Sequence, residues 1–257
     1  MQTLKNYTGA KWVSCSLDGF RHFLRFFRWS IHDQKLQYNF NSLNTSSLFC
    51  YLRAYFLKVY EKERQLTQEE KELAIWWSDD PDVTFSPGGH LYYLANAMVR
   101  KNQPTLIHSA QTFARVGMAV ADAFINCWKW KYHFFSERPN TFIPQFIDQK
   151  WESFWPDPPF PAFPSGHAIQ AGAAATVLIS LYDNKTAIID SAHVGRERDH
   201  VRNTEFVAQS FDSIWQIALE TADSRFFGGI HTPQDNQVGL EQGSIIANNI
   251  VILAWKK

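Results

Sequence analysis

Residues 160–167, with the sequence FPAFPSGH, lead directly into the apolar run AIQAGAAATVL at 168–178. Ser165 is a favourable N-cap residue, so the pattern predicts that a helix begins at Gly166. The first N–H groups of a helix point outward at the positive end of its dipole and bind anions. His167 would lie inside such an anion site as a proton donor. Taken alone, the stretch fits equally well an ordinary helix start whose histidine faces water.

Helical patterns recur along the chain and predict an all-α fold. The expected helices cover about 46–64, 67–77, 104–133, 166–182, 207–226 and the residues from 232 onward. Loops are expected at 83–90, 140–164 and 183–206, which are rich in proline, glycine or charged residues. No run shows the alternation that is typical of a β-strand.

Two of these helices have faces that predict how they pack. The small residues at 171–175 would allow neighbouring helices to approach closely, so the helix over 166–182 is expected to be central. A core-facing stripe is expected along the helix over 104–133, at Leu106, Ala110, Phe113, Gly117, Val120, Phe124 and Trp128.

The bulk properties narrow the class of protein. The chain has 257 residues with 25 basic and 25 acidic side chains, so its net charge of zero does not point to nucleic acid as a partner. Its three cysteines follow no disulfide or zinc spacing, and Cys127 is expected in the core. No apolar run reaches the roughly 20 residues that span a bilayer, and the N-terminus lacks the apolar segment of a signal peptide. A soluble protein without a transmembrane segment is expected, and its compartment stays open.

Polar residues gather at three predicted helix ends. They are Lys131 and Arg138, then Ser165, Gly166 and His167, and finally Arg225, His231 and Asp235. Fixed cations and helix-terminal N–H groups suit a tetrahedral oxyanion. A histidine that a carboxylate holds in one tautomer can act as a nucleophile or a metal ligand. Singly, these residues could be surface charges or helix caps, but together they indicate an active site at converging helix ends.

The same residues resemble a known family signature. K-x6-RP at 131–139, PSGH at 164–167 and SR-x5-H-x3-D at 224–235 are similar in order and spacing to the three motifs of the vanadium haloperoxidase and type 2 phosphatidic acid phosphatase (PAP2) superfamily. The resemblance extends to about 65–250. It implies a single helical-bundle domain over 46–257, preceded by a partly helical N-terminal extension over 1–45 that lies outside the resemblance.

The resemblance also implies roles for individual residues. The oxygens of vanadate or phosphate would be bound by Lys131, Arg138, Ser165, Gly166 and Arg225. His231 would be the vanadium ligand, or the nucleophile of a phosphatase, and Asp235 would orient it. His167 would be the general acid–base. The family's acidic partner for an arginine lies outside the three motifs, and Asp79 or Asp80 is the candidate, although a simple turn also explains that pair.

Two reactions are open to such a site. With vanadate as cofactor, it would oxidise a halide with hydrogen peroxide; without a cofactor, it would hydrolyse a phosphomonoester through a phosphohistidine. Trp128, Pro158 and Phe160 resemble the pocket walls of chloroperoxidases, and Phe160 stands where bromide-preferring relatives carry histidine. The peroxidase is favoured by these residues, and the phosphatase by the short chain. An inactive oxyanion-binding homologue is the third hypothesis, and homodimerisation is left open.

Overall fold

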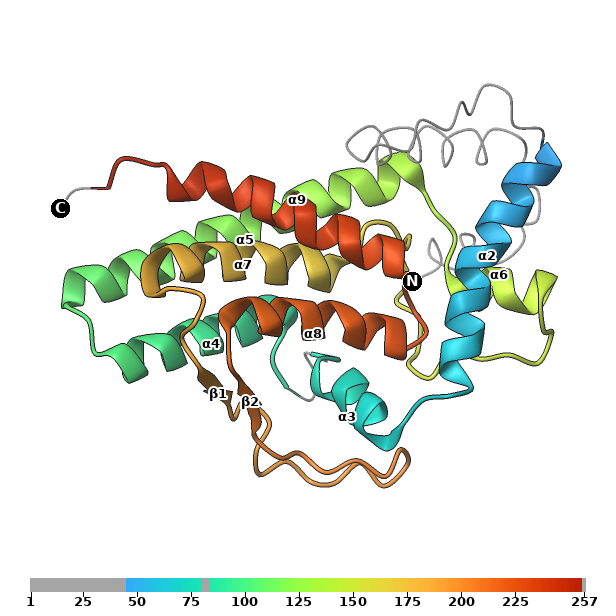
Figure 1. Cartoon of the computed structure of the whole chain (residues 1–257), viewed down its shortest axis with the longest axis horizontal. Coiled ribbons are helices and arrows are strands. Elements are labelled where there is room, and N and C mark those ends of the chain that lie inside the picture. The colour runs from blue at the N-terminus through green and yellow to red at the C-terminus, as the bar shows by residue number, and fades with distance from the viewer. Residues whose placement is uncertain (1–44, 80–83, 256–257) are drawn as a thin grey trace, which may run out of the picture.

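A computed structural model describes residues 45–79 and 84–255, with side chains from residue 53 onward (Figure 1). Its helices are α2 (Thr45–Glu63), α3 (Gln68–Trp76), α4 (Pro87–Asn102), α5 (Leu106–Phe134), α6 (Pro139–Phe146), α7 (Gly166–Tyr182), α8 (Ile214–Phe227) and α9 (Pro233–Val251). Two short antiparallel strands, β1 (Ile188–Asp190) and β2 (Gln209–Phe211), pair with Ile188 opposite Phe211. The all-α helical fold is confirmed. The division at residue 45 stays a prediction, because residues 1–44 lie outside the described part.

Helix α7 is the centre of the bundle. Figure 1 shows it between α9 and α8 with α5 behind it, and it packs against all three. A Cβ added at Gly172 would lie 2.6 Å from the carbonyl oxygen of Leu240, and one added at Gly243 would lie 2.1 Å from that of Ile169. Only glycine lets the α7 and α9 backbones approach this closely, which confirms that the helix is central.

Side-chain caps fix where α7 and α9 begin. The Ser165 hydroxyl accepts a hydrogen bond from the Ala168 N–H at 3.4 Å, and Thr232 forms a capping box with Asp235. The Ser165 N–H donates to the Asp235 carbonyl oxygen at 3.1 Å, so the two helix starts are tied together. The predicted cap at Ser165 and the predicted helix start at 232 are confirmed.

Three predicted segment boundaries are wrong. Helix α4 begins at Pro87, inside the loop expected at 83–90, and α6 (Pro139–Phe146) occupies the first part of the loop expected at 140–164. Proline without an N–H group is favoured in the first turn of a helix, so these prolines begin helices. The helix expected from 207 begins only at Ile214, because residues 209–211 pair with β1.

The buried face of α5 differs from the predicted stripe. The buried positions are Thr112, Val116, Ala119, Val120, Ala123, Cys127 and Lys131, whereas Leu106 is 86% exposed and Phe124 is also exposed. Small residues face α7 because the two helices pack closely, and the large aromatic side chains are displaced to the flanks. The buried face of α5 therefore carries Lys131 into the interior.

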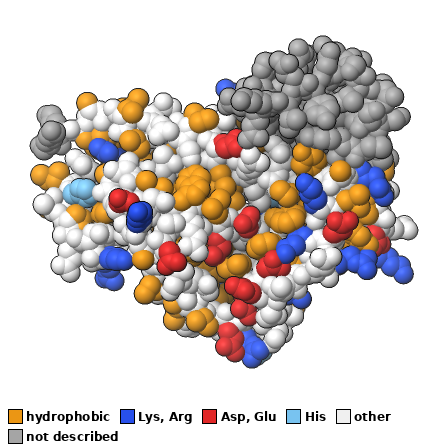
Figure 2. All heavy atoms as spheres, in the orientation of Figure 1, with side chains coloured by type: hydrophobic (Ala, Val, Ile, Leu, Met, Phe, Trp, Pro, Cys, Tyr) orange, Lys and Arg blue, Asp and Glu red, His pale blue; other side chains and the backbone are white. Residues whose placement is uncertain are grey.

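No described helix is long and apolar enough to cross a membrane. Figure 2 shows basic and acidic side chains interspersed on one face, with hydrophobic side chains gathered near its middle.

Candidate active site

Five helix ends converge on one buried cluster of polar side chains. Lys131 lies in the last turn of α5, Arg138 is the N-cap of α6, and Ser165 is the N-cap of α7. Arg225 lies in the last turn of α8, and His231 lies directly before α9. Each of the five side chains is at most 5% exposed. The three groups that are separate in the sequence are thus brought together.

Backbone carbonyl groups of the proline-rich segment hold two of the cations. The Lys131 ammonium donates to the carbonyl oxygens of Pro161 and Ala162 at 2.9 and 2.6 Å. The Arg138 guanidinium donates to those of Phe160 at 3.0 Å and Ile230 at 2.8 Å. Burial lowers the pKa of Lys131 to about 7. The backbone of residues 160–162 therefore holds the charged groups of Lys131 and Arg138 in place.

The third cation is held in the same way. The Arg225 guanidinium donates to the Ser224 hydroxyl at 3.0 Å and to the Ala74 carbonyl oxygen at 2.7 Å. Burial lowers its pKa to about 10, so it stays charged near neutral pH. Within the described part of the chain, no carboxylate lies within 4.0 Å of Lys131, Arg138 or Arg225. Buried cations without counterions are costly, and an anion bound among them would offset that cost.

His231 faces this surplus of positive charge as a neutral ring. Its Nδ1 lies 3.2 Å from Oδ2 of Asp235, which also accepts a hydrogen bond from the Thr232 N–H at 2.9 Å. Its Nε2 lies 3.4 Å from the Arg138 guanidinium. Burial, followed by the charges of Arg138 and Lys131, holds the pKa of His231 well below its usual range. Because the carboxylate needs a donor, we assign the proton to Nδ1, which leaves a lone pair on Nε2.

His167, at the start of α7, lies next to the cations. Its Nε2 is buried, has no hydrogen-bond partner among the described residues and lies 3.8 Å from Oδ2 of Asp79. Burial, followed by the charge of Arg225, lowers the pKa of His167 to about 3. Beside it, a Cβ added at Gly166 would find its nearest atoms, on Cys127 and Lys131, at 4.0 Å. The side of Gly166 that faces Lys131 is therefore not closely packed.

Asp79 is a buried, hydrogen-bonded residue and not merely part of the predicted turn. Its side chain is 4% exposed, and its Oδ1 lies 2.8 Å from Nδ1 of His90. Burial raises the pKa of Asp79, but the neighbouring His193 and His90 outweigh this effect and hold it below its usual range. Asp79 forms no ion pair with Arg225, although its charge raises the pKa of that arginine. Asp80 lies outside the described residues.

The sequence interpretation missed three buried residues behind Asp79. They are His90, Asp190 and His193, each at most 1% exposed. Nε2 of His90 lies 2.8 Å from Oδ2 of Asp190, and neither ring nitrogen of His193 has a hydrogen-bond partner among the described residues. The available signal was Asp190 itself, a lone acidic residue at the end of the apolar run AII at 187–189.

Asp79, His90 and His193 fit a metal ion poorly. Their potential ligand atoms lie within 4.8 Å of one another. Two atoms bound to one transition-metal ion at about 2.1 Å each lie at most about 4.2 Å apart. Both nitrogens of His90 already face carboxylates, so this histidine has no ring nitrogen left for a metal ion. A hydrogen-bonded network describes these residues better.

The predicted wall residues Trp128 and Phe160 lie against the cations. Their ring centroids are 4.8 Å apart, and the Phe160 ring lies 5.3 Å from the Lys131 ammonium and 5.2 Å from the Arg138 guanidinium. The Pro158 carbonyl oxygen accepts a hydrogen bond from the Phe160 N–H at 2.8 Å, which shapes the turn that carries the ring. Their role as pocket walls stays a prediction.

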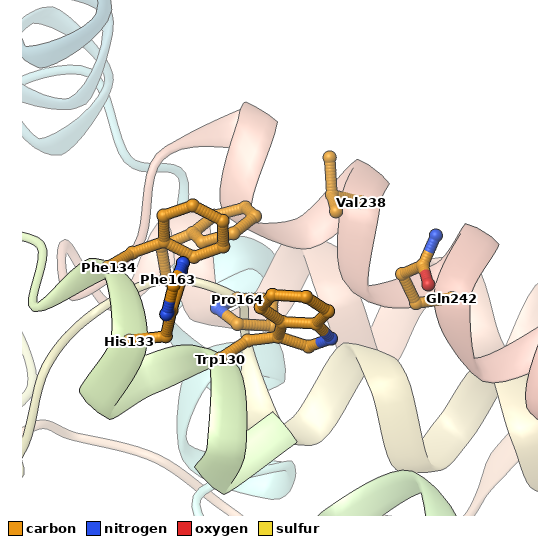
Figure 3. A pocket seen from close by; sticks show the side chains of 7 residues that line it. All are labelled: Trp130, His133, Phe134, Phe163, Pro164, Val238 and Gln242. Atoms are coloured by element: carbon orange, nitrogen blue, oxygen red, sulfur yellow. The ribbon is translucent and has the colours of Figure 1, made fainter. Parts of the chain in front are cut away.

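A separate pocket opens between α5 and α9. Figure 3 shows that Trp130, His133 and Phe134 approach it from α5, and Val238 and Gln242 from α9. Phe163 and Pro164 complete the lining, which contains none of the buried cations. This mostly apolar pocket is unsuited to an oxyanion.

Comparisons with known proteins identify the family. The family model of the VCPO second helical-bundle domain matches residues 111–256. A curated relative, the vanadium chloroperoxidase of Curvularia inaequalis, is 28% identical over 166 residues, which cover 48% of this chain and 27% of that protein. The chain thus spans about a quarter of its length.

Two solved structures have the same fold. The first bacterial vanadium-dependent iodoperoxidase is 32% identical with a TM-score of 0.71, and the match covers 77% of this chain and 48% of that one. A bacterial vanadium-dependent chloroperoxidase in its holo form is 16% identical with a TM-score of 0.62, and the match covers 81% and 50%. This second likeness concerns the fold alone. Because the family model covers more than half of the chain and includes all three motifs, the protein belongs to the vanadium haloperoxidase and PAP2 superfamily.

Proposed function

We propose that the protein is a vanadate-dependent haloperoxidase that oxidises a halide with hydrogen peroxide. One observation carries the proposal: three buried cations without a described carboxylate partner surround a neutral histidine whose Nε2 lone pair faces the Arg138 guanidinium at 3.4 Å. The names of the relatives, a chloroperoxidase and an iodoperoxidase that depend on vanadium, support the same reaction class.

The residues present suit vanadate as the cofactor. Lys131, Arg138 and Arg225 would balance the charge of the oxyanion, and the Ser165 hydroxyl and Gly166 N–H would bind its oxygens. Nε2 of His231 would be the ligand to vanadium, with Asp235 holding the ring. Bound vanadate supplies Lewis-acid activation of peroxide toward attack by the halide.

His167 would move the proton. Its Nε2 is buried beside Asp79, and without a bound anion its pKa lies near 3. An anion among the cations offsets the positive charge that lowers this pKa. The histidine would then take up a proton and exchange it with the bound peroxide.

A phosphatase is the second candidate, and the state of His231 favours it. A neutral imidazole with its lone pair on Nε2 is also a nucleophile for a phosphomonoester. The cations would bind the phosphate, and His167 would protonate the leaving alcohol. This reaction needs no cofactor.

One set of assays separates these functions. The purified protein is freed of metal and assayed with and without orthovanadate, for halogenation of monochlorodimedone with peroxide and each halide and for hydrolysis of p-nitrophenyl phosphate. The haloperoxidase predicts halogenation that requires vanadate and disappears in His231→Ala. His200→Ala, at an exposed histidine, is the matched control.

Other results would contradict the first proposal. Phosphate release that vanadate inhibits, without halogenation, would establish the phosphatase. Vanadate binding with neither activity would leave an oxyanion-binding homologue. Iodide is the first halide to test because it is the most easily oxidised, and Phe160 predicts that bromide is not specially preferred. We propose 46–257 as the catalytic unit and 1–45 as its extension.

A further inference from the structure

A chain of hydrogen bonds runs from the β1–β2 hairpin toward the candidate active site. The Trp76 indole N–H and the Ala192 N–H donate to Asp190 at 2.8 and 2.9 Å. The two ring nitrogens of His90 lie 2.8 Å from Oδ2 of Asp190 and 2.8 Å from Oδ1 of Asp79. Since an ionised carboxylate can only accept, both nitrogens of His90 donate, and the ring is an imidazolium. The stack of His90 on Trp77, 4.5 Å between centroids, suits a cation.

The network uses only one oxygen of Asp79. Oδ1 is held by His90, while Oδ2 faces Nε2 of His167 at 3.8 Å. The backbone of Asp79 has φ of 49°, in the left-handed region that residues with a Cβ rarely adopt. Such a conformation persists where the surroundings enforce it, and it is often found at functional sites. Among the described residues Oδ2 is left without a hydrogen bond, and this oxygen and the enforced backbone both indicate that Asp79 is held for a partner in the site.

We propose that His90 and Asp190 are positioning residues: by holding Oδ1 of Asp79, they keep its Oδ2 directed at His167. Asp190 locks the ring of His90, His90 locks the carboxylate of Asp79, and the carboxylate orients the proton-transfer histidine. The β1–β2 hairpin and α4, which supply Asp190 and His90, are thereby part of the active site. This inference rests on the proposed function, because it takes His167 as the residue that moves the proton.

Two substitutions of one residue test the link. The longer amide of His90→Gln reaches the place of Nε2, so it keeps the contact with Asp190 and loses that with Asp79. The shorter amide of His90→Asn occupies the place of Nδ1 and does the reverse. We expect kcat to fall about 10- to 100-fold in His90→Gln but only about threefold in His90→Asn. The KM for peroxide, or for the phosphate ester, and the Kd for orthovanadate should stay close to those of the wild type in both variants.

A double-mutant cycle distinguishes positioning from mere stabilisation. If His90 acts through Asp79, then Asp79→Asn combined with His90→Gln should lower kcat no further than Asp79→Asn alone. Additive losses of kcat would overturn the proposal. His108→Gln is the control, because His108 lies at the opposite end of α5 from Lys131.

Crystal structures of the two His90 variants test the geometry without any assay of activity. Oδ2 of Asp79 should turn away from His167 in His90→Gln and stay in place in His90→Asn. An unmoved Asp79 in His90→Gln would overturn the proposal whatever reaction the protein performs. Should the wild type catalyse neither halogenation nor phosphate release, the proposed function fails, and the crystal structures still decide whether the network holds Asp79.

Discussion

Two neighbouring groups of buried charges shift the pKa of histidine in opposite directions. Among Lys131, Arg138 and Arg225, burial and positive charge hold the pKa of His231 well below its usual range. A short distance away, His90 lies between two carboxylates. Burial lowers its pKa too, but Asp190 and Asp79 outweigh this effect and raise it to about 9. The sign of the neighbouring charges, and not burial, decides which histidine carries a proton.

This difference distinguishes buried charges that stabilise the fold from buried charges that are arranged to bind an anion. The His90 network neutralises most of its own charge inside the protein. The cation site has a surplus of positive charge that backbone carbonyl groups only partly balance. We therefore expect the network to contribute to stability, and the cation site to sacrifice stability for anion affinity.

Removing one carboxylate of the network should produce the largest loss of stability. Asp190→Ala leaves Nε2 of His90 and the Trp76 indole N–H without a buried acceptor. We expect the free energy of unfolding to fall by about 3–5 kcal/mol, measured by urea denaturation. Asp199→Ala is the control: it breaks the partly exposed pair with Arg202, which should cost at most about 1 kcal/mol. Equal effects of the two substitutions would contradict the comparison.

Removing one cation of the site should weaken anion binding without lowering the stability of the fold. Lys131→Met keeps the apolar stem and removes a buried charge, so we expect an unchanged or higher urea midpoint. The affinity for orthovanadate, measured by isothermal titration calorimetry, should fall about 100-fold. Lys129→Met, at an exposed lysine of the same helix, should change neither quantity. A clear fall of the urea midpoint in Lys131→Met would show that the buried charge of Lys131 does not lower the stability of the fold.

The two kinds of histidine predict opposite slopes of stability against pH. The pKa of His90 is raised to about 9, so its contribution is complete below the unfolded value of about 6.5 and is lost as the pH rises through 9. The pKa of His167 is lowered to about 3, so the unfolded chain binds the extra proton as the pH falls below about 6.5, and stability declines. The combined contribution of these two histidines to the urea midpoint should therefore be greatest near pH 6–7, and Lys131, whose pKa is lowered to about 7, opposes the decline due to His90 above that pH.

Single substitutions test which histidine causes the decline of stability at alkaline pH and which causes it at acid pH. His90→Gln should flatten the alkaline decline, and His167→Gln should reduce the acid decline. Orthovanadate should also reduce the acid decline in the wild type, because the bound anion raises the pKa of the neighbouring histidines. If neither His167→Gln nor orthovanadate changes the decline of stability at acid pH, the link between the cations and His167 is disproved.

The smallest effect concerns the start of α7. Ser165→Ala removes the N-cap and should cost about 1 kcal/mol, whereas Ser165→Gly should cost only a few tenths of that. Both variants remove the hydroxyl that is proposed to bind the oxyanion. The two should therefore weaken orthovanadate binding equally while differing in stability. Unequal losses of affinity would mean that the cap, and not the hydroxyl, matters for binding.

Short-range signals predicted much of the fold and the proposed site residues. Ser165, Thr232 and Pro233 mark helix starts through local hydrogen bonds and backbone restriction, and the structure confirms these starts. The spacing of Lys131, Arg138, His167 and His231 predicted a common site, and the structure brings these residues to neighbouring helix ends. Local chemistry was less decisive at Pro87 and Pro139, because proline both ends helices and begins them.

The sequence by itself determined the helical fold, the starts of α7 and α9 and the set of cations and histidines that meet at the helix ends. These features depend on contacts within a few residues and on motif spacing. Only the tertiary structure decided that His90 and Asp190 reach Asp79, and that Lys131 enters the core from the small-residue face of α5. Which charges become neighbours depends on how α4 packs against α7 and β1 and how α3 packs against α8, and that packing sets the pKa of each histidine.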